Sequence, residues 1–411
     1  MPDPRWLPIL ALALVVGLCA PAGAGPQYLF LNRVPGLAYN QNRPESFTDA
    51  LFEEPLRALG TTGTEGLRLG LSFIFSYLDG PPEAMEASLS RVLALAEKHQ
   101  VPVLIVLDGQ NWWAYRSDLW NWWDPTQPGY DPKNARNVEW SGWGPEHALK
   151  VAWRNWGSQI RVLPPPNLAS RRYRDACRKE LTSLLAVLRR WRDELPPEKR
   201  WLFPGVKIGW EASLGVNAYY YPKGNSYLEQ YPKDDSHDPR TGLRMEADFA
   251  GGLVPIGHAG LTTKGWKRSG EVTLADQERV TADYLTWLSR LCHDAGFPRE
   301  QVFTHCGAQF APWKLHYSYA VGINRYATPG WSFYGVDPAG AGDLGESMDR
   351  AHRQEWCAAE WLPSASTSQE WQAAIRQTLG FRSCRFLSLY NWEGVRGNAD
   401  AVAGIRGSLG R

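Results

Sequence analysis

The chain has 411 residues, with 44 lysines and arginines against 43 aspartates and glutamates, and a formal net charge of +1. Because the charge is near zero and no basic block occurs, nucleic acid and acidic membrane surfaces are disfavoured as partners. Five cysteines follow residue 24 and no C-x-x-C pair is present, which argues against a structural zinc site and a dense disulfide framework. The sequence still permits one or two disulfide bridges and does not indicate which cysteines would pair.

The N-terminus has the pattern of a secretory signal peptide. Arg5 precedes an apolar run from Trp6 to Cys19, and small residues continue to Ala24. Ala22 and Ala24 fit the cleavage rule, so we expect residues 1–24 to be removed and the mature protein to be secreted or periplasmic. A membrane anchor is the alternative, but the run is shorter than the ~20 residues of a spanning helix. A lipid on Cys19 is a further alternative, and no later segment is apolar enough to span a bilayer.

From residue 25 to 411, short apolar runs alternate with amphipathic stretches, which is typical of βα units around a parallel sheet. The predicted strands are residues 28–31, 67–74, 101–107, 205–210, 301–305, 319–326, 355–359 and 385–390. The predicted helices are residues 47–59, 82–99, 168–193, 274–295 and 368–379. This order predicts an α/β fold, a single (β/α)8 TIM barrel with long βα-loop insertions.

Two long insertions, at about 110–165 and 212–272, follow predicted strand ends, and such loops open onto the catalytic face of a barrel. The chain has 21 tryptophans, many of them beside Asn, Asp or Gly, as in residues 111–113 and 121–124. Indole rings stack on the apolar faces of sugars, and neighbouring amides take the hydroxyls. Packing of the loops onto the scaffold is the alternative for any single tryptophan. The group predicts a platform for carbohydrate or another flat ligand.

Carboxylates follow several of the apolar runs, at Asp108, Glu211, Glu360 and Glu393. Hydrolysis of a glycosidic bond needs one carboxylic acid to protonate the leaving oxygen and a second carboxylate as nucleophile or base. A strand-end carboxylate often only caps a helix or pairs with an arginine. Glu211 and Glu360, however, end predicted strands four and seven beneath the tryptophan-rich loops, so we predict that they are the catalytic pair.

These segments resemble clan A of the glycoside hydrolases, a group of retaining (β/α)8 barrels. Residues 207–211 match the end of strand four and residues 356–360 the end of strand seven. The resemblance implies that Glu211 is the acid/base and Glu360 the nucleophile, and that Trp392 is the aromatic residue after strand eight. The clan usually has Asn before the acid/base to hold the 2-hydroxyl of the sugar, and here that position is Trp210.

Further residues near the predicted strand ends complete the expected substrate site. They are Asp108, Gln110, Asn111, Trp112, Trp210, His305, Asn324, Tyr326, Trp392 and Glu393. A tyrosine or histidine near the nucleophile hydrogen-bonds it and sets its charge, a role open to Tyr326 and His305; a structural histidine is the alternative. The chain has no G-x-S-x-G, H-E-x-x-H or P-loop motif, and we expect no metal and no cofactor.

The sequence therefore predicts a retaining glycoside hydrolase that acts on an oligo- or polysaccharide. Two alternatives stay open. One is a polysaccharide-binding barrel without turnover, which Trp210 in place of the clan asparagine favours. The other is a barrel hydrolase or lyase that uses Glu393 or Asp108.

Overall fold

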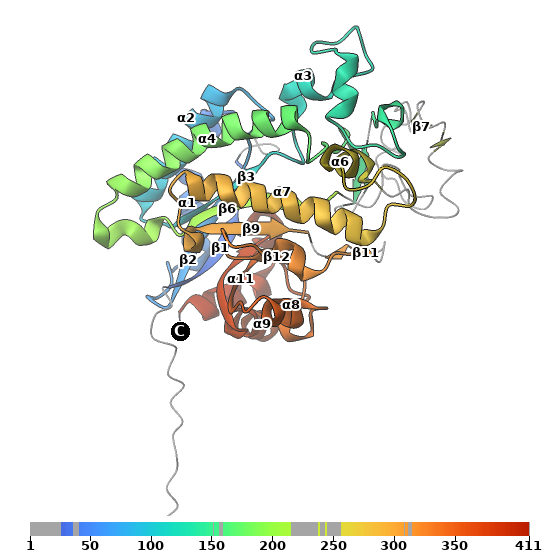
Figure 1. Cartoon of the computed structure of the whole chain (residues 1–411). Helices are drawn as coiled ribbons and strands as arrows, with labels where there is room; N and C mark the ends of the chain where they lie inside the picture. Colours follow the sequence, from blue (N-terminus) through green and yellow to red (C-terminus); the bar gives the residue numbers. More distant parts are fainter. Residues whose placement is uncertain are drawn as a thin grey trace, which may run out of the picture.

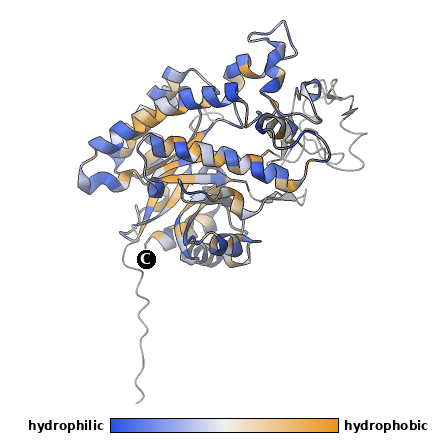
Figure 2. Ribbon diagram, viewed as in Figure 1, coloured by the Kyte–Doolittle hydropathy of each residue, from blue (hydrophilic) through white to orange (hydrophobic). Residues whose placement is uncertain are grey.

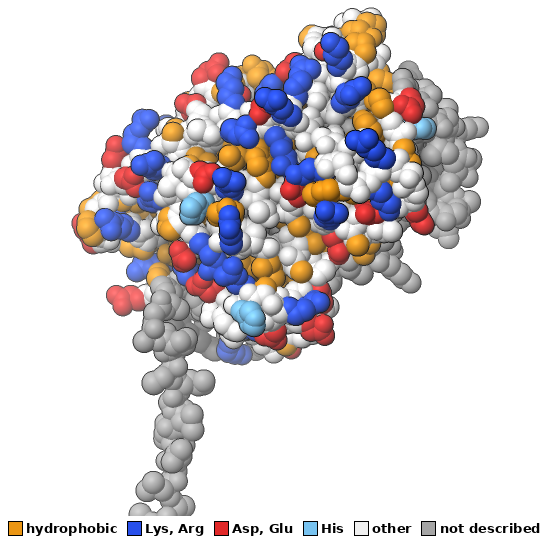
Figure 3. Space-filling view, in the orientation of Figure 1, with side chains coloured by type: hydrophobic (Ala, Val, Ile, Leu, Met, Phe, Trp, Pro, Cys, Tyr) orange, Lys and Arg blue, Asp and Glu red, His pale blue; other side chains and the backbone are white. Residues whose placement is uncertain are grey.

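The computed structural model describes residues 26–35, 41–150, 152–155, 159–214, 237–238, 243–244, 256–307, 309–310 and 315–410. The predicted signal peptide and most of the second insertion lie outside the described residues. Among the described residues, no helix combines the length and apolar character needed to cross a membrane. Figure 3 shows basic and acidic side chains interspersed over one face of the molecule.

Parallel strands form a closed barrel at the centre of the molecule (Figure 1). The strands are β1 (Gln27–Asn32), β2 (Leu67–Ser76), β3 (Val103–Asp108), β6 (Gly205–Ala212), β9 (Val302–Cys306), β12 (Gly330–Phe333), β13 (Glu355–Trp361) and β14 (Ser383–Leu389). Consecutive barrel strands are neighbours around the ring, and β14 pairs with β1 to close it. The predicted single (β/α)8 barrel is confirmed.

Helices cover the outside of the barrel, and Figure 2 shows the apolar strands enclosed by helices with polar outer faces. The helices are α1 (Asp49–Leu59), α2 (Pro82–His99), α4 (Arg171–Glu194), α7 (Leu274–Asp294), α8 (Leu344–Arg350), α9 (Ser368–Gly380) and α11 (Ala399–Leu409). Two of these helices begin with a capping box: Thr273 and Asp276 form one at α7, and Thr367 and Glu370 form one at α9. Shorter elements in the loops are α3 (Ser117–Trp120), β4 (Ala152–Asn155), β5 (Gln159–Val162), β7 (His237–Asp238), β8 (Leu243–Arg244), α6 (His258–Lys264), β10 (Gln309–Phe310), β11 (Leu315–His316) and α10 (Trp392–Val395).

The prediction for strand six, residues 319–326, is wrong. Tyr319–Gly322 forms a 3-10 helix, and the sixth barrel strand is β12. Local side-chain hydrogen bonds explain the error, because Ser318 Oγ accepts from the amide of Ala320 at 3.2 Å and starts the turn. Asn324 Oδ1 then accepts from the amide of Tyr326 at 2.9 Å. These contacts give the backbone a local alternative to sheet pairing.

The barrel interior changes from apolar to polar along the strands. Aromatic and aliphatic side chains fill its N-terminal end: Tyr28, Phe30, Leu104, Phe303 and Phe386. Gly70 faces the Phe30 ring so closely that an added Cβ would lie 2.4 Å from it. Buried polar side chains follow further along the strands: Ser72, Lys207, His305 and Ser388. This polar layer lies beneath the predicted catalytic carboxylates.

Candidate active site

The carboxylates of Glu211 and Glu360 meet at the C-terminal mouth of the barrel. Glu211 lies near the end of β6 and Glu360 near the end of β13, and they are only 3% and 5% exposed. One oxygen of each carboxylate lies within 4.8 Å of the other. The Tyr334 hydroxyl joins them, because it donates to Glu360 Oε1 and lies 3.4 Å from Glu211 Oε1. The two residues chosen from the sequence are thus brought into one buried cluster.

A bulge in β6 aims two consecutive side chains at this cluster. Ile208 pairs with Thr304 of β9, and the next pair is Ala212 with Cys306. Three residues of β6, 209–211, therefore lie opposite the single residue His305. Gly209 and Glu211 adopt φ values of 77° and 48°, in the left-handed region that favours glycine. Neighbouring side chains of a regular strand point to opposite faces. The bulge instead lets Trp210 reach Glu360 while Glu211 reaches Ser332 and Tyr334.

Glu360 is buried but well supplied with donors. Trp210 Nε1 donates to its Oε2 at 3.0 Å, and the Tyr334 hydroxyl donates to its Oε1. Burial and the neighbouring Glu211 charge raise the pKa of Glu360 to about 8, although the Lys207 ammonium and the two donors act in the opposite direction. Burial and the charges of both glutamates raise the pKa of Tyr334 well above 10, so its hydroxyl stays a donor. Its ring is half exposed, and only the hydroxyl end lies among the carboxylates.

Glu211 is held by a chain of two polar residues. Ser332 Oγ donates to Glu211 Oε1 at 2.7 Å, and His305 Nε2 lies 3.0 Å from Ser332 Oγ. Burial and the nearby Lys207 charge hold the pKa of His305 well below 6.5, so the imidazole is neutral. Because the serine proton points to Glu211, the His305 Nε2–H donates to the serine oxygen. His305 therefore lies close to the pair as predicted, within 4.8 Å of an oxygen of each glutamate, but its hydrogen bonding to Glu211 runs through Ser332.

Hydrogen bonds hold the loop after β3 against the end of β6. Asp108 accepts hydrogen bonds from the amides of Gln110 and Asn111 at 3.0 and 3.2 Å. Gln110 Nε2 donates to the Ser213 carbonyl, and Asn111 Nδ2 donates to the Trp210 carbonyl at 2.6 Å. These three predicted residues thus support the site by holding the loop against β6.

An aromatic wall stands beside the pair. Trp210 packs with Ile74 and Val106, and the partly buried Trp112 and Tyr390 lie against the same cluster. Trp112 was predicted as a substrate-binding residue from its place after strand three. Tyr390, directly after β14, is the aromatic residue of strand eight that packs against this cluster.

Trp392 and Glu393 lie in a different cluster, in α10. Trp392 is fully buried and its Nε1 donates to Glu54 at 2.8 Å. Glu393 pairs with Arg33 at 2.8 Å, and Arg33 also pairs with Glu54 at 3.2 Å. The structure does not bring these two predicted residues to the Glu211–Glu360 cluster, because the turn into α10 directs them toward α1.

Asn324 and Tyr326 precede β12 and so lie at its N-terminal end, away from the mouth. Asn324 Nδ2 donates to Ser289 of α7 at 3.0 Å, and the Tyr326 ring lies 5.3 Å from the His293 ring. Their place at a strand end depended on the wrong strand six. With β12 in its observed position, the strand-end residue is Tyr334, which sequence reasoning missed together with Ser332 and Lys207. The apolar run at 330–333 after Pro329 was the available signal.

The oxygens and nitrogen of Glu211, His305 and Glu360 lie within 4.8 Å of one another, a spacing suited to a metal ion. The donor set fits a cation poorly, because Trp210, Ser332 and Tyr334 already donate to the carboxylate oxygens. A second group in the described part of the chain, Asp49, Glu53 and His99, lies outside the barrel, and Lys98 Nζ is 2.6 Å from Asp49 Oδ1. Neither group therefore indicates a metal centre.

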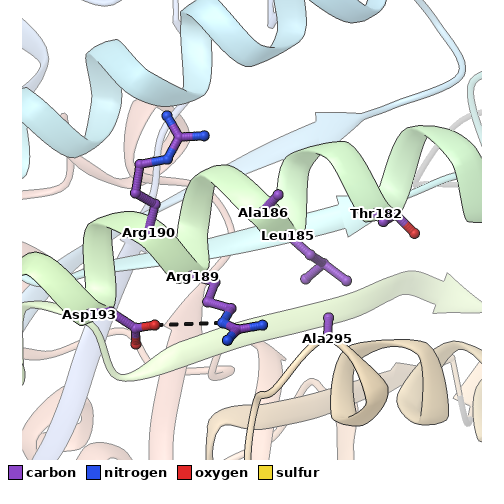
Figure 4. A pocket seen from close by; sticks show the side chains of 7 residues that line it. All are labelled: Thr182, Leu185, Ala186, Arg189, Arg190, Asp193 and Ala295. Atoms are coloured by element: carbon purple, nitrogen blue, oxygen red, sulfur yellow. Dashed lines mark ion pairs between the residues drawn. The ribbon is translucent and has the colours of Figure 1, made fainter.

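A cavity of about 310 Å³ lies on the outer helical layer (Figure 4). It is lined mainly by α4, with Ala295 after α7 on its other side. Arg189 pairs with Asp193 at 3.5 Å along α4, so two of the charged side chains that line the cavity bind each other. The paired carboxylates of the mouth remain the candidate site.

No protein-family model and no curated protein matches the chain. Solved structures with a similar arrangement include GH5_18 from Streptomyces cattleya in complex with Manb1-4GlcNAc, at 11% identity and a TM-score of 0.44, covering 93% of this chain and 80% of that one. A modular endo-beta-1,4-mannanase of glycoside hydrolase family 26 from Cellulomonas fimi is 9% identical, with a TM-score of 0.38, over 94% and 71% of the two chains. The 3-keto-D-glucoside 4-epimerase of E. coli is 9% identical, with a TM-score of 0.38, over 93% and 97%.

Proposed function

We propose that this protein is a glycoside hydrolase that cleaves an oligo- or polysaccharide with retention of configuration. One observation carries the proposal: two buried carboxylates have oxygens within 4.8 Å of each other at the mouth of a (β/α)8 barrel. Retaining glycosidases hold their carboxyl groups about 5–5.5 Å apart, whereas inverting enzymes need about 6.5–9.5 Å to admit a water molecule between them. The short separation supports the retaining route.

Hydrogen bonding supports Glu360 as the nucleophile and Glu211 as the acid/base. Both Glu360 oxygens accept hydrogen bonds from aromatic side chains, which favours the charged carboxylate needed for attack. The Glu360 carboxylate would attack the anomeric carbon as the Glu211 proton passes to the leaving oxygen, which forms a glycosyl ester and releases the first product. Glu211 would then take a proton from water, whose oxygen displaces Glu360 from the sugar.

The surroundings of the pair support a carbohydrate substrate. The aromatic wall of Trp210, Trp112 and Tyr390 lies beside the pair, and the Tyr334 ring is half exposed above it. Such surfaces suit the apolar faces of sugar rings. With the N-terminal segment 1–24 as a signal peptide, the enzyme would act outside the cytoplasm, where polysaccharides are met.

The proposal is tested with single carboxylate-to-amide variants on a panel of oligosaccharides. Glu360→Gln and Glu211→Gln are each expected to lower kcat by at least about 100-fold on an unactivated substrate. Glu393→Gln is the matched control, because Glu393 also follows a barrel strand but pairs with Arg33, and it should keep wild-type turnover. Nuclear magnetic resonance of the first product should show the anomer of the substrate.

Two outcomes would contradict the proposal. Full turnover in Glu360→Gln would remove the nucleophile from the scheme. Tight sugar binding by the wild type, unchanged in Glu360→Gln and without any hydrolysis, would identify a polysaccharide-binding barrel instead.

A further inference from the structure

A lysine lies buried inside the barrel beneath the two carboxylates. Lys207 is on β6, in register with Val106 of β3 and Phe303 of β9, and is 3% exposed. Lysine is almost never fully buried without a partner, and barrel interiors are normally filled by apolar side chains. The position therefore needs a reason beyond packing.

The Lys207 ammonium contacts the segment that carries Glu360. Its Nζ donates to the carbonyl of Ala359 at 2.5 Å, and Ala359 directly precedes Glu360 on β13. Burial lowers the pKa of Lys207, and the charges of Glu360 and Glu211 act in the opposite direction. The same attraction lowers the pKa of Glu360 against the effects of burial and of Glu211. The three groups thus form one buried charge cluster.

We propose that Lys207 is a positioning residue of this site, whose ammonium fixes the Glu360 segment through the Ala359 carbonyl and stabilises the charged form of the Glu360 carboxylate. This inference rests on the proposed function for its catalytic meaning. Without the ammonium, two carboxylates would face each other in a buried site, and such a pair holds one proton strongly. A protonated Glu360 has no negative oxygen with which to attack an anomeric carbon.

The other groups facing the cluster do not supply this positive charge. From β9, His305 is neutral because burial holds its pKa well below 6.5. From β13, burial raises the pKa of the Cys357 thiol well above 9, and from the end of β12 the Tyr334 hydroxyl is likewise neutral. At the level of Lys207, β3 contributes the apolar Val106. The positive charge of the cluster therefore comes from Lys207.

The test separates the charge of Lys207 from its hydrogen bond. Lys207→Gln keeps an N–H donor and removes the charge, whereas Lys207→Arg keeps the charge. In Lys207→Gln the acidic limb of kcat/KM should move to higher pH by about 1–3 units, the effect of losing a nearby opposite charge. Lys207→Arg should keep the limb near its wild-type pH. Lys199→Gln, on the protein exterior beside Glu97, is the matched control and should change neither limb.

A purely structural role would lower kcat/KM equally at every pH and leave the acidic limb in place, and that result in Lys207→Gln would overturn the proposal. Lys207→Met, of similar length, replaces the glutamine variant if the latter does not fold. Infrared difference spectra against Glu360→Gln, taken in each background, follow the Glu360 carboxylate band without any turnover. If the wild type hydrolyses no glycoside, the proposed function fails. The infrared titration still tests the role of Lys207 in that case. A titration of the Glu360 band at higher pH in Lys207→Gln supports that role, and an unchanged titration refutes it.

Discussion

The Glu360 carboxylate is oriented by two aromatic donors. Trp210 Nε1 binds one oxygen and the Tyr334 hydroxyl binds the other, so rotation of the carboxylate would break both hydrogen bonds. Hydrogen bonds to an ionised acceptor are roughly twice as strong as neutral ones. At the position where the resembling clan usually has an asparagine, the Trp210 indole thus donates a hydrogen bond to Glu360, the nucleophile of the proposed function. Tyr334 additionally lies 3.4 Å from Glu211 and so couples the two glutamates.

Tyr334→Phe removes one donor from Glu360 and leaves the ring in place. We expect kcat/KM to fall about 10- to 100-fold, since a hydrogen bond to a charged group contributes about 1.5–3 kcal/mol. The thermal unfolding midpoint should change little, because the ring is half exposed. Steady-state kinetics and a melting curve measure both effects. Tyr115→Phe, an exposed tyrosine of the loop after β3, is the control, and equal activity of the two variants would refute the role of Tyr334.

At the level of single elements, β6 shows where sequence reasoning reached its limit. The apolar run at 205–210 and the carboxylate after it were enough to predict a strand ending at a catalytic mouth. The bulge was not predictable in the same way, because it depends on how residues 209–211 pair with β9. Gly209 was the one local signal, since glycine within a strand often marks a bulge. Trp210 and Glu211 both face the site only because β6 pairs with β9 in this irregular way.

Gly209→Ala should disturb the bulge. An added Cβ would lie 3.2 Å from Ala212 Cβ and 3.4 Å from the His305 carbonyl oxygen, at a φ of +77°. We expect a loss of about 1–2 kcal/mol in the free energy of unfolding, the usual cost of left-handed backbone for a residue with a Cβ. Activity should fall as well, because the side chains of Trp210 and Glu211 would no longer be held in the orientations that contact Glu360 and Ser332. Urea unfolding measures the first effect, with Gly340→Ala as control since nothing lies within 4 Å of its Cβ position; equal stability of both variants would contradict the argument.

The short helix α6 begins on a buried carboxylate. Glu139 Oε2 and Oε1 accept hydrogen bonds from the amides of Ala259 and Gly260, both at 3.2 Å. Burial nevertheless raises the pKa of Glu139 to about 8, from an ordinary value of 4.5. The folded protein therefore binds a proton more tightly than the unfolded chain between these two values, and stability falls as the pH rises through this window.

Glu139→Gln should remove that dependence. For the wild type we expect this group to lower the free energy of unfolding by a few kcal/mol between about pH 4.5 and 8, at about 1.4 kcal/mol per pKa unit. The variant should lack that part of the decline and gain stability relative to the wild type as the pH rises. Urea unfolding at pH 5, 6, 7 and 8 measures it, with the exposed Glu346→Gln as control. Parallel pH profiles for wild type and Glu139→Gln would show that Glu139 is charged when folded.

For the whole molecule, the barrel was predictable because most of its strands are continuous apolar runs followed by amphipathic helices. The strand that failed, β12, is only Gly330–Phe333, while the more conspicuous run at 319–326 forms local turns. The meeting of Glu211 and Glu360 was predictable because it depends only on which residues end β6 and β13. Trp392 and Glu393 were misplaced because the turn into α10 directs them to Glu54 and Arg33, a long-range contact with no local signal.

The cysteines bear on how the whole fold is stabilised. Cys177, Cys292, Cys306, Cys357 and Cys384 are all buried and unbridged, on α4, α7, β9, β13 and β14. Burial raises the pKa of the Cys177 and Cys384 thiols to about 12, so almost no reactive thiolate forms near neutral pH. The described fold therefore needs no disulfide, even in an oxidising compartment.

We expect the thermal unfolding midpoint to be the same with and without dithiothreitol, because loss of a native disulfide would cost about 2–5 kcal/mol. A thiol reagent such as dithionitrobenzoate at pH 8 should leave these five cysteines unmodified in the native protein and label all of them in guanidinium. Cys19 lies within the predicted signal peptide, so a Cys19→Ala chain gives the same count whether or not that peptide is removed. A lower midpoint in reductant, or fewer than five thiols in the denatured protein, would reveal a bridge and show that the core alone does not hold the barrel.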